Sequence, residues 1–313
     1  MSDLSEGVAI GIDAGGTKTL AILVDAHGRE IARASTGGAN PWDVGPDAAR
    51  AALHIVLNQL MTGGNVSVVC LGAAGIDREA DRLAAEMRLR ALLPGRIATI
   101  VRNDAAAVLG LIGSDRPAMV IVADTGSISY GESADGAVTR AGGLGAVLGD
   151  CASALSLGMA ILRHVAGVLD GYVRRGPLAD GAIERLGVHH ATEIVARIRH
   201  PDLDEPLVES LATLLTDAVK SGDADAKEII ASESAALARN AGHVARAIRT
   251  SEVLPVLIVG KVFGWIPDIR DRVIAAVRKT GKVSLVEAAE GVHGAARLAL
   301  ELARERDLPP DPD

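Results

Sequence analysis

The sequence predicts an α/β protein built from two similar domains that face one cleft. Two observations carry this prediction: short apolar stretches of strand length alternate with longer stretches of helical spacing, and one glycine-containing hairpin pattern occurs twice. A chain of 313 residues is long enough for two domains with a sizeable core. Its composition, 49% hydrophobic and 23% charged, is typical of a soluble globular protein.

The first copy of the hairpin pattern lies at residues 7–25. An apolar stretch leads into Asp13-Ala14-Gly15-Gly16-Thr17-Lys18, and a second apolar stretch follows, which predicts strand, tight turn and strand. Two glycines let the backbone approach a ligand closely, and consecutive N–H groups in such a turn can bind phosphate oxygens. Asp13 suits a hydrated Mg²⁺ bound to that phosphate. The alternative for this stretch alone is an ordinary hairpin turn.

The rest of the first half continues the α/β alternation. A strand at 30–35 follows the hairpin, and a glycine-rich loop at 36–45 contains Trp42. The next predicted elements are a helix at 47–60, a strand at 66–71, a helix at 78–93, a strand at 97–101 and a helix of small residues at 105–112.

The second half opens with a copy of the hairpin. A strand at 119–123 leads into Asp124-Thr125-Gly126-Ser127, as the first strand leads into residues 13–18. In both copies a later glycine turn and then a Gly-Gly pair follow, Gly37-Gly38 and Gly142-Gly143. Four features in the same order favour two related domains over chance repetition of glycine turns.

Helical patterns dominate the remainder. The predicted elements are a helix at 153–168, a nearly all-helical segment at 178–250, a strand at 255–259, a helix at 266–279, a strand at 283–286 and a helix at 291–306. We therefore expect a first domain at 1–115 and a second at 116–290 with a helical insertion at 178–250. The last helix, 291–306, could return to complete the first domain.

Charge and composition argue against several classes of partner. The formal net charge of −8 disfavours nucleic acid and anionic membranes as partners. Apolar runs are too short to span a bilayer, and the acidic start has no signal-peptide pattern. Cys70 and Cys151 form no metal-ligand pair and no disulfide framework, which favours a reducing cytoplasm.

The ordered motifs resemble a known family. They read, in order, Asp-x-Gly-Gly-Thr, Gly-x-x-Asn-x-x-x-x-Gly, Leu-Gly-x-Ala-Gly, Asn-Asp-Ala, Thr-Gly-Ser, Gly-Gly-x-Gly-x-x-x-Gly-Asp and Val-Gly. This set is similar to the N-acetylglucosamine kinase branch of the BadF/BadG/BcrA/BcrD ATPase family, in the actin–hexokinase–Hsp70 superfamily. The likeness extends from Gly11 to about Ala299.

The resemblance implies two ribonuclease-H-like domains with ATP and Mg²⁺ in a central cleft. It implies a cytoplasmic enzyme, in some members a homodimer, that phosphorylates N-acetylglucosamine or glucosamine at the 6-hydroxyl. The implied nucleotide-binding positions are Gly15, Gly16, Thr17, Lys18, Thr125, Gly126, Ser127 and Gly260. The implied sugar-binding positions are Asn40, Trp42, Asp104, Gly143 and Asp150, with Asp104 as catalytic base and Asp13 and Asp124 on the metal side.

The chemistry of sugar phosphorylation supports these roles. A hydroxyl that attacks the γ-phosphate needs a carboxylate to accept its proton, and Asp104 lies just past a strand's carboxyl end, where α/β proteins bind ligands. The alternative role of Asp104 is N-cap of the helix that starts at residue 105. Asp150 could likewise cap the helix from Ser153, and Trp42 could be a buried anchor instead of a ring against the sugar.

Three positions depart from the pattern of the family. Asp124 replaces the first glycine of Gly-Thr-Gly-Ser, Gly149–Ala154 replaces Gly-Asp-Glu-Gly-Ser-Gly, and Gly260-Lys261 replaces Gly-Gly. The charge of Asp124 would repel ATP, or, if Asp124 is the counterpart of Asp13, would contribute to Mg²⁺ hydration.

Three other functions therefore stay open. One is a sugar-binding regulatory homologue without catalysis, and a second is a kinase of a different sugar. A third is a reductive activator ATPase, which needs cysteines that bridge an iron–sulfur cluster.

Overall fold

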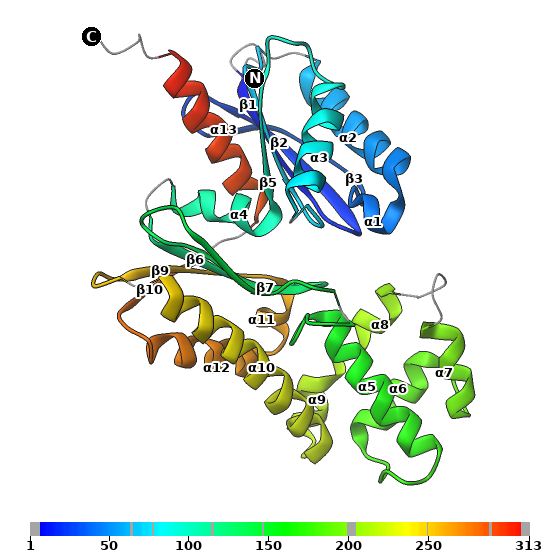
Figure 1. Ribbon diagram of the computed structural model, residues 1–313. Helices are drawn as coiled ribbons and strands as arrows, with labels where there is room; N and C mark the ends of the chain where they lie inside the picture. Colours follow the sequence, from blue (N-terminus) through cyan, green and yellow to red (C-terminus); the bar gives the residue numbers. More distant parts are fainter. Residues whose placement is uncertain are drawn as a thin grey trace. The chain divides into compact units, whose positions relative to one another are not determined.

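The computed structural model describes residues 7–62, 65–76, 78–113, 116–145, 147–198, 205–248, 250–287 and 290–307 (Figure 1). Its contacts divide the chain into two compact units. Unit 1 contains Met1–Asp115 and Ala288–Asp313, and unit 2 contains Arg116–Glu287. Each unit contains one five-stranded mixed sheet.

The sheet of unit 1 begins with an antiparallel meander and ends in parallel strands. Its strands are β1 (Gly7–Ala14), β2 (Lys18–Asp25), β3 (Glu30–Gly37), β4 (Val68–Ala73) and β5 (Ala98–Asn103). Their order is β3-β2-β1-β4-β5, in which β1, β4 and β5 run parallel. The parallel strands share their carboxyl ends, so this end of the sheet is also where β1 turns into β2.

Helices cover both faces of this sheet. Helices α2 (Pro46–Met61) and α3 (Glu79–Arg90) pack on the face to which Ile10 and Ile12 point. Helix α13 (Val292–Asp307) packs on the opposite face with Ala9, because side chains alternate along a strand (Figure 1). A Cβ at Gly11 would lie 2.2 Å from the backbone nitrogen of Ala296, so this glycine lets α13 approach β1 closely.

The sheet of unit 2 repeats the topology of unit 1. Its strands are β6 (Ala118–Ala123), β7 (Ser127–Glu132), β8 (Val138–Gly142), β9 (Leu254–Val259) and β10 (Val283–Glu287). The order β10-β9-β6-β7-β8, taken from β8, matches the order in unit 1 strand for strand. The predicted fold class, two similar ribonuclease-H-like α/β domains, is confirmed at the level of each unit.

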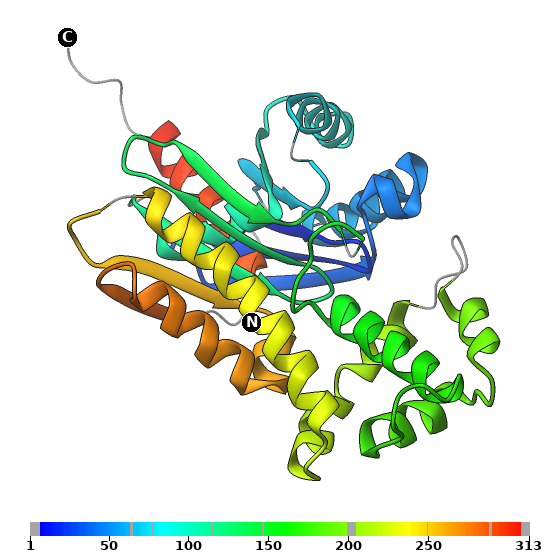
Figure 2. The ribbon, with the colours of Figure 1, turned by 60° about the horizontal axis from the view of Figure 1, so that its bottom comes forward.

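Unit 2 contains most of the helices. Helices α10 (Ala224–Ile248) and α12 (Pro267–Arg278) lie side by side on its sheet (Figure 2). The others are α5 (Ala154–Leu169), α6 (Pro177–Leu186), α7 (Ala191–Ile198), α8 (Glu205–Leu211), α9 (Leu214–Lys220) and α11 (Lys261–Trp265). Within the described residues, no helix has both the length and the apolar character needed to cross a membrane.

Two short helices were not predicted, and proline explains both. The expected loop at 36–45 contains α1 (Pro41–Val44), which starts at Pro41. The expected helix at 266–279 is preceded by α11, and the two are separated at Ile266, which has φ −131° and ψ 82°. The residue before a proline is disfavoured in the helical region, so the break occurs directly before Pro267. The predicted small-residue helix divides into α4 (Asp104–Leu109) and a 3₁₀ turn at Gly110–Ile112.

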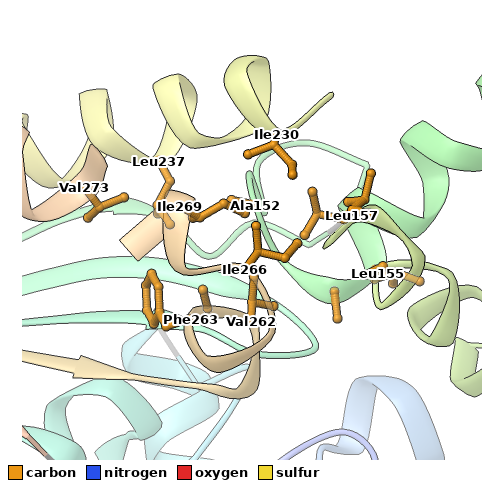
Figure 3. Packing of buried hydrophobic residues seen from close by; sticks show 14 of the residues in the cluster. Ala152, Leu155, Leu157, Ile230, Leu237, Val262, Phe263, Ile266, Ile269 and Val273 are labelled. Atoms are coloured by element: carbon orange, nitrogen blue, oxygen red, sulfur yellow. The ribbon is translucent and has the colours of Figure 1, made fainter. Parts of the chain in front are cut away.

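The core of unit 2 joins α11 to the long helices. Val262 and Phe263 of α11 pack with Ile266, with Ile269 of α12 and with Leu237 of α10 (Figure 3). All five belong to one cluster of buried residues. The residues at the start of α11 are therefore held in place by the core of the unit.

We predict that Gly11→Ala destabilises the protein by about 1–3 kcal/mol, because its Cβ would overlap the backbone of α13. The matched control is Gly37→Ala in β3 of the same sheet, where a Cβ would meet nothing within 4 Å. Urea denaturation of both variants measures the difference. Equal stability of the two variants would contradict the close packing of α13 on β1.

Candidate functional site

The segment that follows β3 forms hydrogen bonds with the first glycine turn. The backbone N–H of Gly15 donates to the carbonyl of Lys18 at 2.9 Å and closes the turn. The N–H groups of Ala39 and Asn40 both donate to the carbonyl of Gly15, at 3.0 and 3.2 Å. The side chains of the predicted phosphate-loop residues Thr17 and Lys18 are exposed. The turn is thus a fixed backbone loop with its polar side chains towards solvent.

A carboxylate that sequence reasoning missed lies against this turn. A Cβ at Gly16 would lie 2.5 Å from Asp43 Oδ2, and Asn40 Nδ2 donates to the same oxygen at 2.7 Å. Loss of solvation raises the pKa of Asp43 above its usual value, although the hydrogen bond from Asn40 opposes the shift. A larger residue at position 16 would have to displace this carboxylate. The sequence around Asp43 carries no signal for this contact.

Asn40 and Trp42, the predicted sugar-binding residues of unit 1, are tied to each other. Asn40 is the N-cap of α1, and its Oδ1 accepts a hydrogen bond from the backbone N–H of Trp42. The Trp42 indole N–H donates to the carbonyl of Gly75 at 3.1 Å, while 67% of the residue stays exposed. The alternative that Trp42 is a buried anchor is wrong. Its ring is held in one place and is open to a ligand.

Asp104 lies at the same edge of the sheet as the first turn. The register places Ala14, Ala73 and Asn103 in one row across β1, β4 and β5. Asp104 follows this row directly, as the first turn does on β1. A Cβ at Gly72 would lie 2.5 Å from the Ala107 side chain, so this glycine lets α4 and its first residue, Asp104, lie directly against β4.

The N-cap of α4 is Asn103 and not Asp104. The Asn103 side chain accepts a hydrogen bond from the N–H of Ala105 at 3.0 Å, and Asp104 is the first residue inside the helix. Asp104 Oδ1 is also 2.7 Å from the same N–H. Asn103 therefore holds the N-cap position, and Asp104 shares its donor, the N–H of Ala105.

The second turn, Asp124–Gly126, is attached to the start of α5. The N–H of Asp124 donates to the carbonyl of Gly126 at 2.8 Å. The first N–H groups of α5 donate to the carbonyls of Asp124 and Thr125, at 2.7 and 3.4 Å. Ser127 is buried, and its hydroxyl donates to the carbonyl of Cys151 at 2.6 Å. The Ser127 hydroxyl therefore stabilises the turn, and Thr125 and Gly126 are its more exposed members.

Asp150 supports the second turn as Asp43 supports the first. A Cβ at Gly126 would lie 2.7 Å from Asp150 Oδ2. The Asp150 carboxylate accepts hydrogen bonds from the N–H groups of Gly145, Leu144 and Ser127, the first at 3.0 Å. Burial raises the pKa of Asp150 despite these bonds. The proposal that Asp150 caps the next helix is wrong, since Ser153 caps α5.

Gly143, the other predicted sugar-binding position in unit 2, lies on the same loop. Its φ is 68°, a conformation that favours glycine. Its N–H donates to the carbonyl of Ser127 at 2.8 Å, and its carbonyl accepts from Arg140 Nη2 at 2.7 Å. Gly143 and Asp150 thus both contact the end of the second turn.

A lysine is held beside the second turn by the close packing of β9 on β6. A Cβ at Gly260, which has φ 121°, would lie 2.1 Å from the carbonyl oxygen of Ala123. The next residue, Lys261, places its Nζ 3.1 Å from Asp124 Oδ1 and 2.6 Å from Glu209 Oε2. Two of the positions that depart from the family pattern, Asp124 and Lys261, therefore form an ion pair.

The electrostatics of this pair explain how Asp124 is tolerated. Burial lowers the pKa of Lys261, but the hydrogen bond to Glu209 and the charge of Asp124 outweigh burial, so the pKa of Lys261 lies above its usual value. The lysine stays charged at neutral pH and offsets the charge of Asp124. Glu209 comes from α8 in the helical insertion, far from the turn in sequence, and no motif marks it.

Asp13 and Asp124 differ in their fit to a magnesium ion. Asp13 lies inside β1 opposite Leu20, at the edge that carries the first turn, and a single carboxylate there suits a largely hydrated ion. Asp124 follows the end of β6 and is engaged by Lys261, so it does not fit that role as placed. The described residues contain no cluster of three or more His, Cys, Asp or Glu that could form a protein-only metal site.

Neither cysteine suits an iron–sulfur cluster. Cys70 is fully buried in β4, and burial raises the pKa of its thiol to about 12. Burial also raises the pKa of Cys151. A cluster that bridges two subunits needs thiols at the surface, and Cys70 has no exposed surface to offer it.

Two sheets of equal topology, each with a glycine turn after its first strand, define the actin-like ATPase fold. The chain belongs to the BadF/BadG/BcrA/BcrD ATPase family, whose model matches residues 10–299. It is 33% identical over 211 residues to an N-acetyl-D-glucosamine kinase of Dictyostelium discoideum, a match that covers 62% of this chain and 65% of that protein. The matched part is thus less than two thirds of the relative's length.

Further relatives agree in fold. An N-acetylmuramic acid/N-acetylglucosamine kinase of Clostridium acetobutylicum is 26% identical over 234 residues, which cover 71% of this chain and 74% of that one. A candidate N-acetylglucosamine kinase structure from Chromobacterium violaceum has TM-score 0.71 and 24% identity, and covers 93% and 98% of the two chains. A ROK family glucokinase of Streptomyces griseus, bound to glucose and AMPPNP, has TM-score 0.55 and 20% identity, with 95% and 99% coverage.

We predict that Asn103→Ala lowers the free energy of unfolding by about 1 kcal/mol, because it removes the N-cap of α4. Asp104→Asn keeps an oxygen near the same N–H and should change stability by less than about 0.5 kcal/mol. Urea denaturation of both variants measures this. A larger loss for Asp104→Asn would show that Asp104 is the structural cap.

Proposed function

We propose that the protein is an ATP-dependent kinase that phosphorylates an amino sugar, N-acetylglucosamine or glucosamine, at its 6-hydroxyl. The observation that carries the proposal is the place of Asp104, a carboxylate at the sheet edge that also bears Asp13 and the first glycine turn. The printed activities of the Dictyostelium and Clostridium relatives support the substrate class. Both cysteines are free thiols, which supports a reducing, cytoplasmic setting.

The proposed chemistry is in-line phosphoryl transfer. Asp104 accepts the proton of the sugar hydroxyl. At the same time the oxygen of that hydroxyl forms a bond to the γ-phosphorus, and the bond from this phosphorus to ADP breaks. Backbone N–H groups at Gly16 and Thr17 stabilise negative charge on the phosphates, while the Gly15 N–H closes the turn. A magnesium ion, which Asp13 would hold through water, would neutralise further charge on the phosphates.

Recognition of the sugar is proposed to use the exposed ring of Trp42. An indole held by its N–H to Gly75 presents an apolar face that suits the C–H face of a pyranose. Asn40 mainly stabilises α1, since its side-chain oxygen accepts a hydrogen bond from the N–H of Trp42 and its side-chain nitrogen donates to Asp43. A kinase of a different sugar remains the second candidate, and the sugar panel below distinguishes the two.

We predict that the purified protein with ATP and Mg²⁺ releases ADP fastest with N-acetylglucosamine or glucosamine. A coupled ADP assay over these sugars, glucose, N-acetylmannosamine and N-acetylmuramic acid measures the preference. The 6-deoxy analogue of the preferred sugar should bind and not turn over, because it lacks the attacking hydroxyl. Turnover of the 6-deoxy analogue would refute the 6-position, and preference for another sugar would refute the substrate.

We predict that Asp104→Asn reduces kcat by roughly 10²–10⁴-fold, the usual cost of losing a general base. Sugar affinity should stay within a few-fold, because the amide retains its size and a hydrogen-bonding oxygen. The coupled assay gives kcat, and calorimetry gives the sugar Kd. Near wild-type turnover would reject Asp104 as the base. The control is Asn103→Ala, which should retain turnover despite its lower stability.

A further inference from the structure

The second turn of unit 2 contains a lysine–carboxylate cluster that the proposed transfer chemistry does not use. Lys261 Nζ donates to Glu209 Oε2 at 2.6 Å and to Thr125 Oγ1 at 3.3 Å, and lies 3.1 Å from Asp124 Oδ1. An ammonium has three N–H donors, and these three oxygens account for all of them. The cluster joins the turn, the end of β9 and the helical insertion.

The three charged side chains differ in exposure, from the mostly buried Glu209 to the half-exposed Asp124. Lys261 is followed by Val262 and Phe263, whose side chains lie in the core of the unit (Figure 3). Its ammonium also lies 5.6 Å from the ring centroid of Trp265, and the Glu209 side chain is only 11% exposed. The Asp124 side chain is 50% exposed. Asp124 is therefore the member of the cluster that is most open to solvent.

The position of the lysine has two consequences for an anion at this turn. Its charge offsets that of Asp124, which otherwise stands at the turn and repels phosphate. Its N–H occupies a lone pair of Thr125 Oγ1, so that this hydroxyl keeps its own proton to donate elsewhere. Both effects make the turn a better phosphate site.

We propose that Lys261 is a positioning residue for phosphate at the second turn, which acts by cancelling the charge of Asp124 and by orienting the Thr125 hydroxyl as a donor. The inference rests on the proposed function in one respect, namely that this turn receives the phosphates of a nucleotide. It goes beyond that function because it gives two residues of opposite charge, Asp124 and Lys261, a joint effect on nucleotide affinity.

Calorimetric titration of ADP and of adenosine into a double-mutant cycle tests the proposal. The variants are Lys261→Met, Asp124→Asn and the two together, in chelator and in Mg²⁺. We expect Lys261→Met alone to raise the Kd for ADP about tenfold, because it removes a positive charge beside the turn and leaves the charge of Asp124 uncancelled. Asp124→Asn alone should lower that Kd, because it removes the opposing charge, and the double variant should bind ADP within about threefold of the wild type. The Kd for adenosine should stay within about twofold throughout.

Adenosine separates a phosphate effect from a structural one. Equal weakening of ADP and adenosine by Lys261→Met would overturn the proposal, because a structural role affects both ligands alike. A double variant that binds ADP as weakly as Lys261→Met would also overturn it, because Asp124 would then not be the charge that the lysine cancels. So would weaker ADP binding by Asp124→Asn in Mg²⁺ alone, since Asp124 would then serve the ion.

Controls address charge and folding. Lys227→Met removes an exposed lysine from α10 of the same unit and should leave both affinities unchanged. Lys261→Met leaves the mostly buried Glu209 unpaired, so the cycle is repeated with Glu209→Gln, in which the Asp124-dependent difference should persist.

If the wild-type protein binds neither ADP nor ATP, with or without sugar, the proposed function fails and this inference with it. Nucleotide binding in which Asp124→Asn does not rescue Lys261→Met overturns this inference alone.

Discussion

The close approach of a carboxylate to a glycine in each hairpin turn is the constraint on which the candidate site depends. A Cβ at Gly16 would lie 2.5 Å from Asp43 Oδ2 and one at Gly126 2.7 Å from Asp150 Oδ2, so a larger residue would have to displace the carboxylate. In both units the carboxylate comes from the segment after the third strand of the sheet. Backbone hydrogen bonds close both turns, and N–H groups held in this way can bind a phosphate with little reorganisation. The duplicated topology extends this design to both halves of the chain.

Much of the fold follows from local sequence. Strands and helices were predictable because apolar residues repeat with the two characteristic periods, and the duplication was predictable from the repeated glycine turns. The errors have local causes as well, since proline at 41 and 267 starts α1 and α12 and so divides the expected elements. Contacts between distant segments were not predictable. Glu209 reaches Lys261 from the helical insertion, and a single sequence gives no measure of such a distance.

Contacts in the structure explain the departures from the family pattern. The charge introduced by Asp124 is met by Lys261, so the two changes are understood together. Ala152 stands where the family pattern has glycine and adopts φ 58°, a left-handed conformation that costs about 1–2 kcal/mol for a residue with a Cβ. Its N–H donates to Glu233 Oε2 at 2.6 Å, a contact from α10 that holds this conformation. Each of these changes is therefore matched by a contact within unit 2, Asp124 with Lys261 and Ala152 with Glu233.

The central proposal is that the first glycine turn receives phosphates of ATP while Asp104, at the same sheet edge, receives the proton of the sugar. A crystal structure of the protein with ADP, Mg²⁺ and N-acetylglucosamine tests it most directly. The account predicts phosphate oxygens within hydrogen-bond distance of backbone N–H groups in the first turn, and an Asp104 oxygen about 2.6–3.2 Å from the sugar O6. Phosphates bound away from this turn, or a sugar whose O6 lies out of reach of Asp104, would contradict it.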